Sequence, residues 1–183
     1  MSLTNTRENF GWVSIGLHWL LAVALIAMYF VGDWMVGLDY YSPWYKVAPD
    51  LHRSVGVLVG ALMVMRLLWN HIQVRPEPLG HQSPLMRRLA TAAHHLLYLM
   101  VFIIVVSGYL ISTAKGQGVD VFGLFEIPAL LGNSVKRGEL AGDIHEYLAL
   151  AFILLVVLHA LAAIVHHLYY KDRTLKRMLG IKQ

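Results

Sequence analysis

The sequence predicts an all-α integral membrane protein, a bundle of four transmembrane helices in one domain that covers residues 1–183. Of the 183 residues, 57% are hydrophobic and only 14% are charged. Three stretches contain no Asp, Glu, Lys or Arg: Asn9–Gly32, Leu89–Ala114 and Tyr147–Tyr170. Each exceeds the roughly 20 residues with which a helix spans a bilayer. A fourth stretch carries one arginine near each end of an uncharged interior, Val55–Met65.

The helices are expected at roughly 11–33, 51–72, 90–113 and 144–170. The first begins beside aromatic residues that suit the headgroup boundary, and it is expected to remain as an uncleaved anchor because it is too long for a signal peptide. A proline-containing loop, Gln73–Pro84, follows the second helix. The longest connection, Ser112–Asp143, contains an apolar piece that is too short and too broken by acids to span, so we expect it on the surface.

Charge and cysteine content limit the possible functions. The chain has no cysteine, which excludes disulfides, thiolate-bound iron–sulfur clusters and covalent C-x-x-C-H haem attachment. The net charge of +4 reflects the loops, and no soluble basic domain is present to bind nucleic acid. The basic tail, 171–183, suits an anionic membrane surface.

The basic residues also predict orientation. One side of the membrane would carry ten of them and the other five, so the positive-inside rule places both termini in the cytoplasm of a bacterial inner membrane. The ten are Arg7, Arg66, Arg75, Arg87, Arg88, Lys171, Arg173, Lys176, Arg177 and Lys182, and the five are Lys46, Arg53, Lys115, Lys136 and Arg137.

Two histidines share one face of the last helix. His145 and His159 are fourteen residues apart, which places them on nearly the same face and roughly 21 Å apart along the axis. Polar side chains at membrane depth are costly and usually functional. This spacing suggests one helix that contributes an axial ligand to each of two haems.

Depth in the membrane sorts the ligands into pairs. The first helix enters the membrane from the cytoplasmic side and places His18 at the same depth as His159. The second helix begins at the outer side, where His52 lies at the depth of His145. Each pair would bind one haem, and two axial imidazoles leave no open position for substrate, as in an electron carrier. The alternative is a divalent metal-ion transporter, which would need three or four ligands at one depth.

Four further residues are candidates for haem contacts. Arg66 stands fourteen residues after His52 and would pair with a haem propionate or else reach lipid phosphate. Gly56 and Gly60 would make room for a porphyrin or for helix packing. His94 would touch a haem edge or face the headgroups.

Several motifs together resemble the prokaryotic cytochrome b561 family over essentially the whole chain. They are Leu17-His18-Trp19, the Leu-His-x-Ser-x-Gly of Leu51–Gly56, His145-Glu146, Leu158-His159-Ala160, His166-His167 and Lys171-Asp172-x-Thr-Leu-x-Arg-Met178. The resemblance implies four membrane helices, two b-type haems and electron exchange with membrane quinone such as ubiquinone. Its axial ligands fall on His18, His52, His145 and His159.

The function expected from the resemblance is a quinone-linked membrane oxidoreductase that works alone or as a homodimer, and superoxide is a candidate electron donor because some relatives oxidise it. The main alternative is an electron-transfer subunit docked to a periplasmic dehydrogenase. His166, at the inner boundary on the face of His159, is a candidate for quinone binding or for headgroup contact. Arg53 would attract superoxide locally, although the outer loops carry seven acids against five bases.

Overall fold

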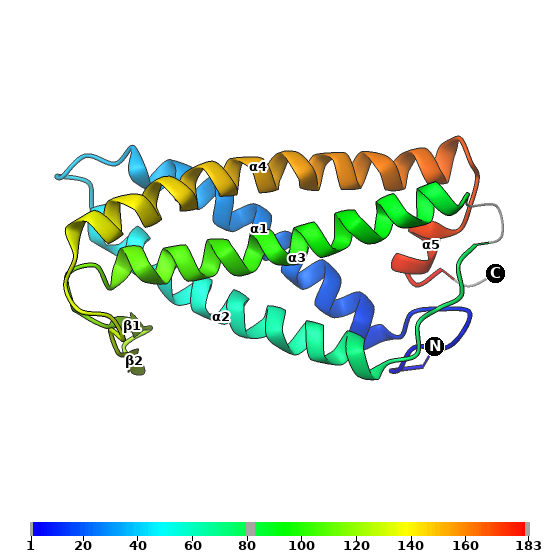
Figure 1. The fold of residues 1–183 in the computed structure, drawn as a ribbon, viewed down its shortest axis with the longest axis horizontal. Helices are drawn as coiled ribbons and strands as arrows, with labels where there is room; N and C mark the ends of the chain where they lie inside the picture. The colour runs from blue at the N-terminus through cyan, green and yellow to red at the C-terminus, as the bar shows by residue number, and fades with distance from the viewer. Residues whose placement is uncertain (1, 80–82, 182–183) are drawn as a thin grey trace. The chain divides into compact units, whose positions relative to one another are not determined.

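The computed structural model describes residues 2–79 and 83–181 (Figure 1). Within them, four helices are long and apolar enough to cross a membrane, which confirms the predicted fold class. The last two residues of the expected basic tail, 182–183, lie outside the described residues. The helices are α1 (Trp12–Val36), α2 (Trp44–Ile72), α3 (Pro84–Ser112) and α4 (Val135–Leu168), and a short helix, α5 (Thr174–Met178), follows.

Three of these helices begin earlier than the apolar stretches indicate. α2 starts at Trp44, α3 at Pro84 and α4 at Val135, ahead of the starts expected at 51, 90 and 144. The added turns contain charged residues such as Lys46 and Glu139. Charges limit the part of a helix that lies in hydrocarbon, but the i to i−4 backbone hydrogen bonds continue through them.

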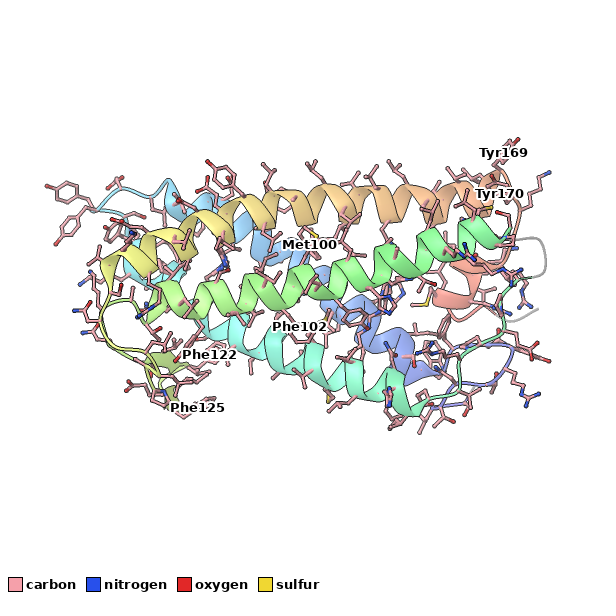
Figure 2. All side chains as sticks on the ribbon, in the orientation of Figure 1. Met100, Phe102, Phe122, Phe125, Tyr169 and Tyr170 are labelled. Carbon is pink, nitrogen blue, oxygen red and sulfur yellow. The ribbon has the colours of Figure 1, made fainter. Side chains whose placement is uncertain are left out.

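The chain divides into two compact units, and each of the four long helices contributes to both. The first unit comprises Met1–Ala22, Leu62–Tyr98 and Leu154–Gln183, and the second comprises Val23–Ala61 and Leu99–Ile153. Both chain ends and α5 therefore belong to the first unit, where Figure 2 shows Tyr169 and Tyr170 just beyond α4.

A β-hairpin in the second unit was not predicted. β1 (Val119–Val121) pairs antiparallel with β2 (Phe125–Ile127), and Figure 2 shows Phe122 and Phe125 on this hairpin. Phe122 and Gly123 both have positive φ, 54° and 69°, as the central residues of a type I′ turn do. The hydroxyl of Ser54 on α2 accepts a hydrogen bond from the Phe122 N–H at 3.1 Å, which attaches the hairpin to that helix.

The long helices expose most of their apolar side chains. Val23 and Phe30 on α1 are 65% and 61% exposed, whereas Val101 on α3 is 1% exposed. Large apolar surface on helices of this length is what lipid contact requires, because hydrocarbon replaces water as the solvent of these side chains.

Candidate functional site

The second unit brings together two of the predicted ligands, His52 from α2 and His145 from α4. Their ring centres are 6.3 Å apart and the ring planes lie at 72°. Both residues are partly shielded within membrane-spanning helices, where an imidazole without a function would be costly.

The backbone of α3 selects the tautomer of the His145 ring. Its Nδ1 lies 2.9 Å from the carbonyl oxygen of Ile104 and 3.2 Å from the Ser107 hydroxyl. A carbonyl can only accept, so Nδ1 carries the proton and Nε2 keeps a lone pair. That tautomer is the one in which Nε2 binds a metal, and this type of second partner is usual for ligating histidines.

Each imidazole of this pair packs against a glycine of a neighbouring helix. A Cβ atom at Gly32 on α1 would lie 3.2 Å from Cε1 of His52, and one at Gly108 on α3 would lie 3.2 Å from Cε1 of His145. Both distances are tighter than ordinary packing, so any larger residue would push the ring. Nothing in the sequence distinguishes these two glycines, because a glycine in an apolar helix has no distinctive neighbours along the chain.

The first unit brings together the other two predicted ligands. The ring centres of His18 on α1 and His159 on α4 are 6.4 Å apart, with an angle of 64° between planes. His94 on α3 lies closer to His159, with 5.2 Å between ring centres, and the Trp19 ring stands 5.2 Å from that of His18.

Arg66 extends from α2 to the His18 ring. Its Nη2 lies 2.9 Å from Nδ1 of His18, and its guanidinium carbon lies 5.6 Å from the centre of the Tyr98 ring. Tyr98 in turn accepts a hydrogen bond from Asn70 at 2.8 Å. A cation is thus held beside one ring of the pair within the membrane-spanning part of the chain.

The remaining predicted residues lie in varied surroundings. Gly60 packs against α3, where an added Cβ would approach Cγ1 of Val105 to 2.9 Å, while a Cβ at Gly56 would touch only the end of Met28 at 3.6 Å. Arg53 forms an ion pair with Asp50, one turn earlier on α2.

His166 near the end of α4 has an acidic partner. Its Nδ1 lies 2.6 Å from Oδ2 of Asp172, whose side chain is only 6% exposed. Burial alone raises the pKa of Asp172, but hydrogen bonds from Thr174 and His166 outweigh it and hold the pKa below its usual value. The carboxylate is therefore ionised and accepts the Nδ1 proton of His166, so that Nε2 is the remaining ring nitrogen for another partner.

The spacing of both pairs fits one metal ion held between two imidazoles. A metal–imidazole bond is about 2 Å long and the ring centre lies about 1.1 Å behind the nitrogen, so opposite ligands have centres about 6.2 Å apart. The two observed separations match this value, whereas the 5.2 Å between His94 and His159 is too short. In residues 2–79 and 83–181, no three His, Cys, Asp or Glu side chains are placed to hold a metal ion by themselves. Two-ligand sites of this kind suit a haem, whose porphyrin supplies the other four ligands.

The family assignment follows from comparison with known proteins. The model of the prokaryotic cytochrome b561 family matches residues 9–180. The chain belongs to this family. It is 47% identical to cytochrome b561 homolog 2 of Escherichia coli (strain K12) over 180 residues, which are 98% of this chain and 96% of that protein.

Two further family relatives span nearly the same length. The probable superoxide oxidase CybB of Yersinia pestis is 32% identical over 97% of this chain and 99% of its own. Cytochrome b561 homolog 1 of Escherichia coli (strain K12) is 28% identical over 94% of this chain and 97% of its own. Membership of the family makes the chain a bacterial membrane cytochrome that uses b-type haem.

Proposed function

We propose that this cytochrome b561 family member binds two b-type haems and carries electrons across the bacterial inner membrane to or from the quinone pool. The observation that carries the proposal is the pair of imidazole couples, each with the ring separation of two ligands on one metal ion. His18 and His159 would hold one haem, and His52 and His145 the other. When bound, such a haem supplies one-electron transfer without an open position for substrate.

The residues around the two pairs have different tasks. At the second-unit pair, the Ile104 carbonyl and Ser107 hold His145 in the ligating tautomer, and Gly32 and Gly108 let the rings lie close to the helices. At the first-unit pair, Arg66 supplies a positive charge suited to a haem propionate.

A quinone site at His166 completes the proposal. Reduction of a quinone to a quinol takes up two electrons and two protons, so the site needs a proton donor. With Nδ1 held by Asp172, the Nε2 of protonated His166 donates to a quinone carbonyl oxygen and then regains a proton from water. The excess of basic residues supports a cytoplasmic location for this end of α4 and for both termini.

The test is rapid mixing of dithionite-reduced protein with decylubiquinone, followed by the haem absorption bands. His166→Ala should slow haem reoxidation by about a hundredfold, the lower end of the range for loss of a general acid. His71→Ala, a matched change of an exposed histidine in the last turn of α2, should leave the rate unchanged. Equal rates in all three proteins would show that the quinone does not react at His166. Purified protein without haem would contradict the whole proposal.

Superoxide is a second candidate as electron donor, favoured by the name of the 32% identical relative from Yersinia pestis. The pairing of Arg53 with Asp50 reduces the local attraction for an anion that Arg53 alone would exert. Donor tests should therefore show fast haem reduction by superoxide with weak dependence on salt. Slow reduction, together with a soluble dehydrogenase that co-purifies with the protein, would instead favour an electron-transfer subunit.

A further inference from the structure

A cavity outside the histidine sites lies between the two ends of the chain in the first unit. It has a volume of about 410 Å³ and is walled by the N-terminal segment before α1 and by residues of the C-terminal segment in and around α5. None of the residues proposed to bind haem, quinone or an electron donor lines it. Its chemically distinctive residues are Glu8, Phe10, Arg173 and Arg177.

Backbone and side-chain hydrogen bonds hold both walls of the cavity in place. Asn5 of the N-terminal segment donates its N–H to the Gln73 side chain at 3.0 Å. On the other wall, the indole N–H of Trp19 donates to the Met178 carbonyl at 2.8 Å, which ties α5 to α1. Both walls of the cavity are therefore attached by hydrogen bonds to other parts of the first unit.

Two arginines line one wall at a spacing of four residues. One nitrogen of Arg177, Nη1, donates to the Glu77 carbonyl at 2.8 Å, but its Nε is buried and has no hydrogen-bond partner among the described residues. Burial lowers the pKa of Arg177, and the neighbouring Arg173 adds to this effect. Two neighbouring cations on one wall are stabilised by an anion that accepts hydrogen bonds from the N–H groups they expose to the cavity.

Glu8 lines the same cavity. Among the residues that the structure describes, the charged lining is Arg173, Arg177 and Glu8, that is, two cations and one anion. Asp172 is close enough to act on Arg177, but its carboxylate already accepts from His166 and Thr174. A ligand that matches this lining has a single anionic group and, beside it, a hydrogen-bond donor.

The depth of the cavity in the membrane further limits the classes of ligand that can reach it. Phe10 lines it, and α1 enters its apolar span only two residues later, at Trp12. Aromatic residues at the start of a spanning helix mark the level of the lipid headgroups. The cavity therefore lies where a phospholipid places its phosphate.

We propose that this cavity binds the headgroup of one membrane phospholipid. The phosphodiester would accept hydrogen bonds from Arg173 and Arg177, and an N–H or O–H group of the head alcohol would donate to the Glu8 carboxylate. Ethanolamine carries N–H donors and glycerol carries O–H donors, so phosphatidylethanolamine and phosphatidylglycerol both fit. Choline carries neither, so phosphatidylcholine cannot donate to Glu8.

The test measures retained lipid on the purified holoprotein by native mass spectrometry, after delipidation and addition of one phospholipid at a time. Phosphatidylethanolamine and phosphatidylglycerol should bind more tightly than phosphatidylcholine of the same acyl chains. Arg173→Gln should weaken both by about tenfold, the effect of losing one hydrogen bond between charged groups. Lys176→Gln, an exposed position of α5 that does not line the cavity, removes the same charge and should have little effect.

A second variant tests the specificity. Glu8→Gln should reduce the preference for the two donor-bearing lipids over phosphatidylcholine, because a neutral amide accepts more weakly than a carboxylate. Unchanged haem spectra and unfolding temperature would show that each variant is folded. Equal binding of all three lipids to the unaltered protein would overturn the proposal, as would equal losses in Arg173→Gln and Lys176→Gln. Full competition by millimolar inorganic phosphate would show a simple anion site and would also overturn it.

Discussion

Arg66 and His18 are joined by a contact of 2.9 Å between Nη2 of the arginine and Nδ1 of the histidine. Arginine can only donate, so Nδ1 accepts in this arrangement and the proton of the neutral ring is on Nε2. Iron binding through Nε2 requires the opposite tautomer, which Arg66 cannot partner. Binding of haem would therefore release the guanidinium from His18 and leave it for a carboxylate such as a propionate.

Arg66→Gln should accordingly lower the midpoint potential of one haem. Loss of the nearby cation favours the more positive, oxidised iron, and an effect of tenfold on the equilibrium corresponds to about 60 mV for one electron. A potentiometric titration followed by the haem bands measures it. Arg66→Lys keeps the charge and should retain most of the potential, so equal shifts in both variants would point to packing and not to charge.

Four histidine variants should fall into two spectral classes. His18→Ala and His159→Ala should each remove the same haem, and His52→Ala and His145→Ala the other, because each pair holds one iron from both sides. The pyridine haemochrome assay should then fall from two haems per chain to one. His94→Ala is the control, since its 5.2 Å separation from His159 is too short for a shared iron. Four indistinguishable variants would contradict the pairing.

The sequence predicted the membrane helices and the pairing of histidines because both depend on simple periodicity. Uncharged stretches set the spans, and matched depths selected His18 with His159 and His52 with His145, which the structure places within 6.4 Å and 6.3 Å. These features follow from helical rise alone and need no knowledge of side-chain packing.

Contacts between helices could not be predicted in this way. The packing of Gly108 against His145 depends on how α3 and α4 lie beside one another, which no local pattern encodes. The hairpin was missed for a different reason: Phe122 occupies a positive-φ position that usually holds Asn, Asp or Gly, so its turn lacked the usual residues. The partner of His166, Asp172, follows a break in the helix that spacing on a helical face cannot cross.

Gly108→Ala should disturb one haem without removing it. The new methyl group would lie 3.2 Å from Cε1 of His145 and push the ring from its place. We expect altered low-spin signals in electron paramagnetic resonance for the haem of His52 and His145, and a stability loss of about 1 kcal/mol.

Gly60→Ala provides the matched control for this change. Its methyl group would meet Val105 at 2.9 Å and no histidine, so stability should fall while both haem signals remain. Val105→Ala should restore the stability by making room. Changed haem signals in Gly60→Ala would mean that the two glycines do not have separate roles.

Asp172→Asn should remove a pH-dependent contribution to stability. The folded pKa of Asp172 lies below the ordinary value of 3.8, so its contribution is present above that value and is lost as pH falls through the folded pKa. The free energy of unfolding of the unaltered protein, measured by thermal unfolding, should therefore decrease below about pH 4. The loss should be roughly 1 kcal/mol, the contribution of this charged hydrogen bond. The variant should be less stable at pH 7 and show a smaller decline in acid; parallel curves would contradict the assignment.

Single cysteines can determine the topology cleanly, because the chain has none of its own. Gln117 is exposed in the connection between α3 and β1, and Arg75 is exposed in the segment that follows α2. By the positive-inside rule, the ten-to-five distribution of basic residues predicts that the first lies outside and the second in the cytoplasm. An impermeant maleimide should therefore label Gln117→Cys in intact cells and Arg75→Cys only after the cells are opened. The reverse pattern would place the His166–Asp172 pair at the outer surface, and quinone protons would then be exchanged with the periplasm.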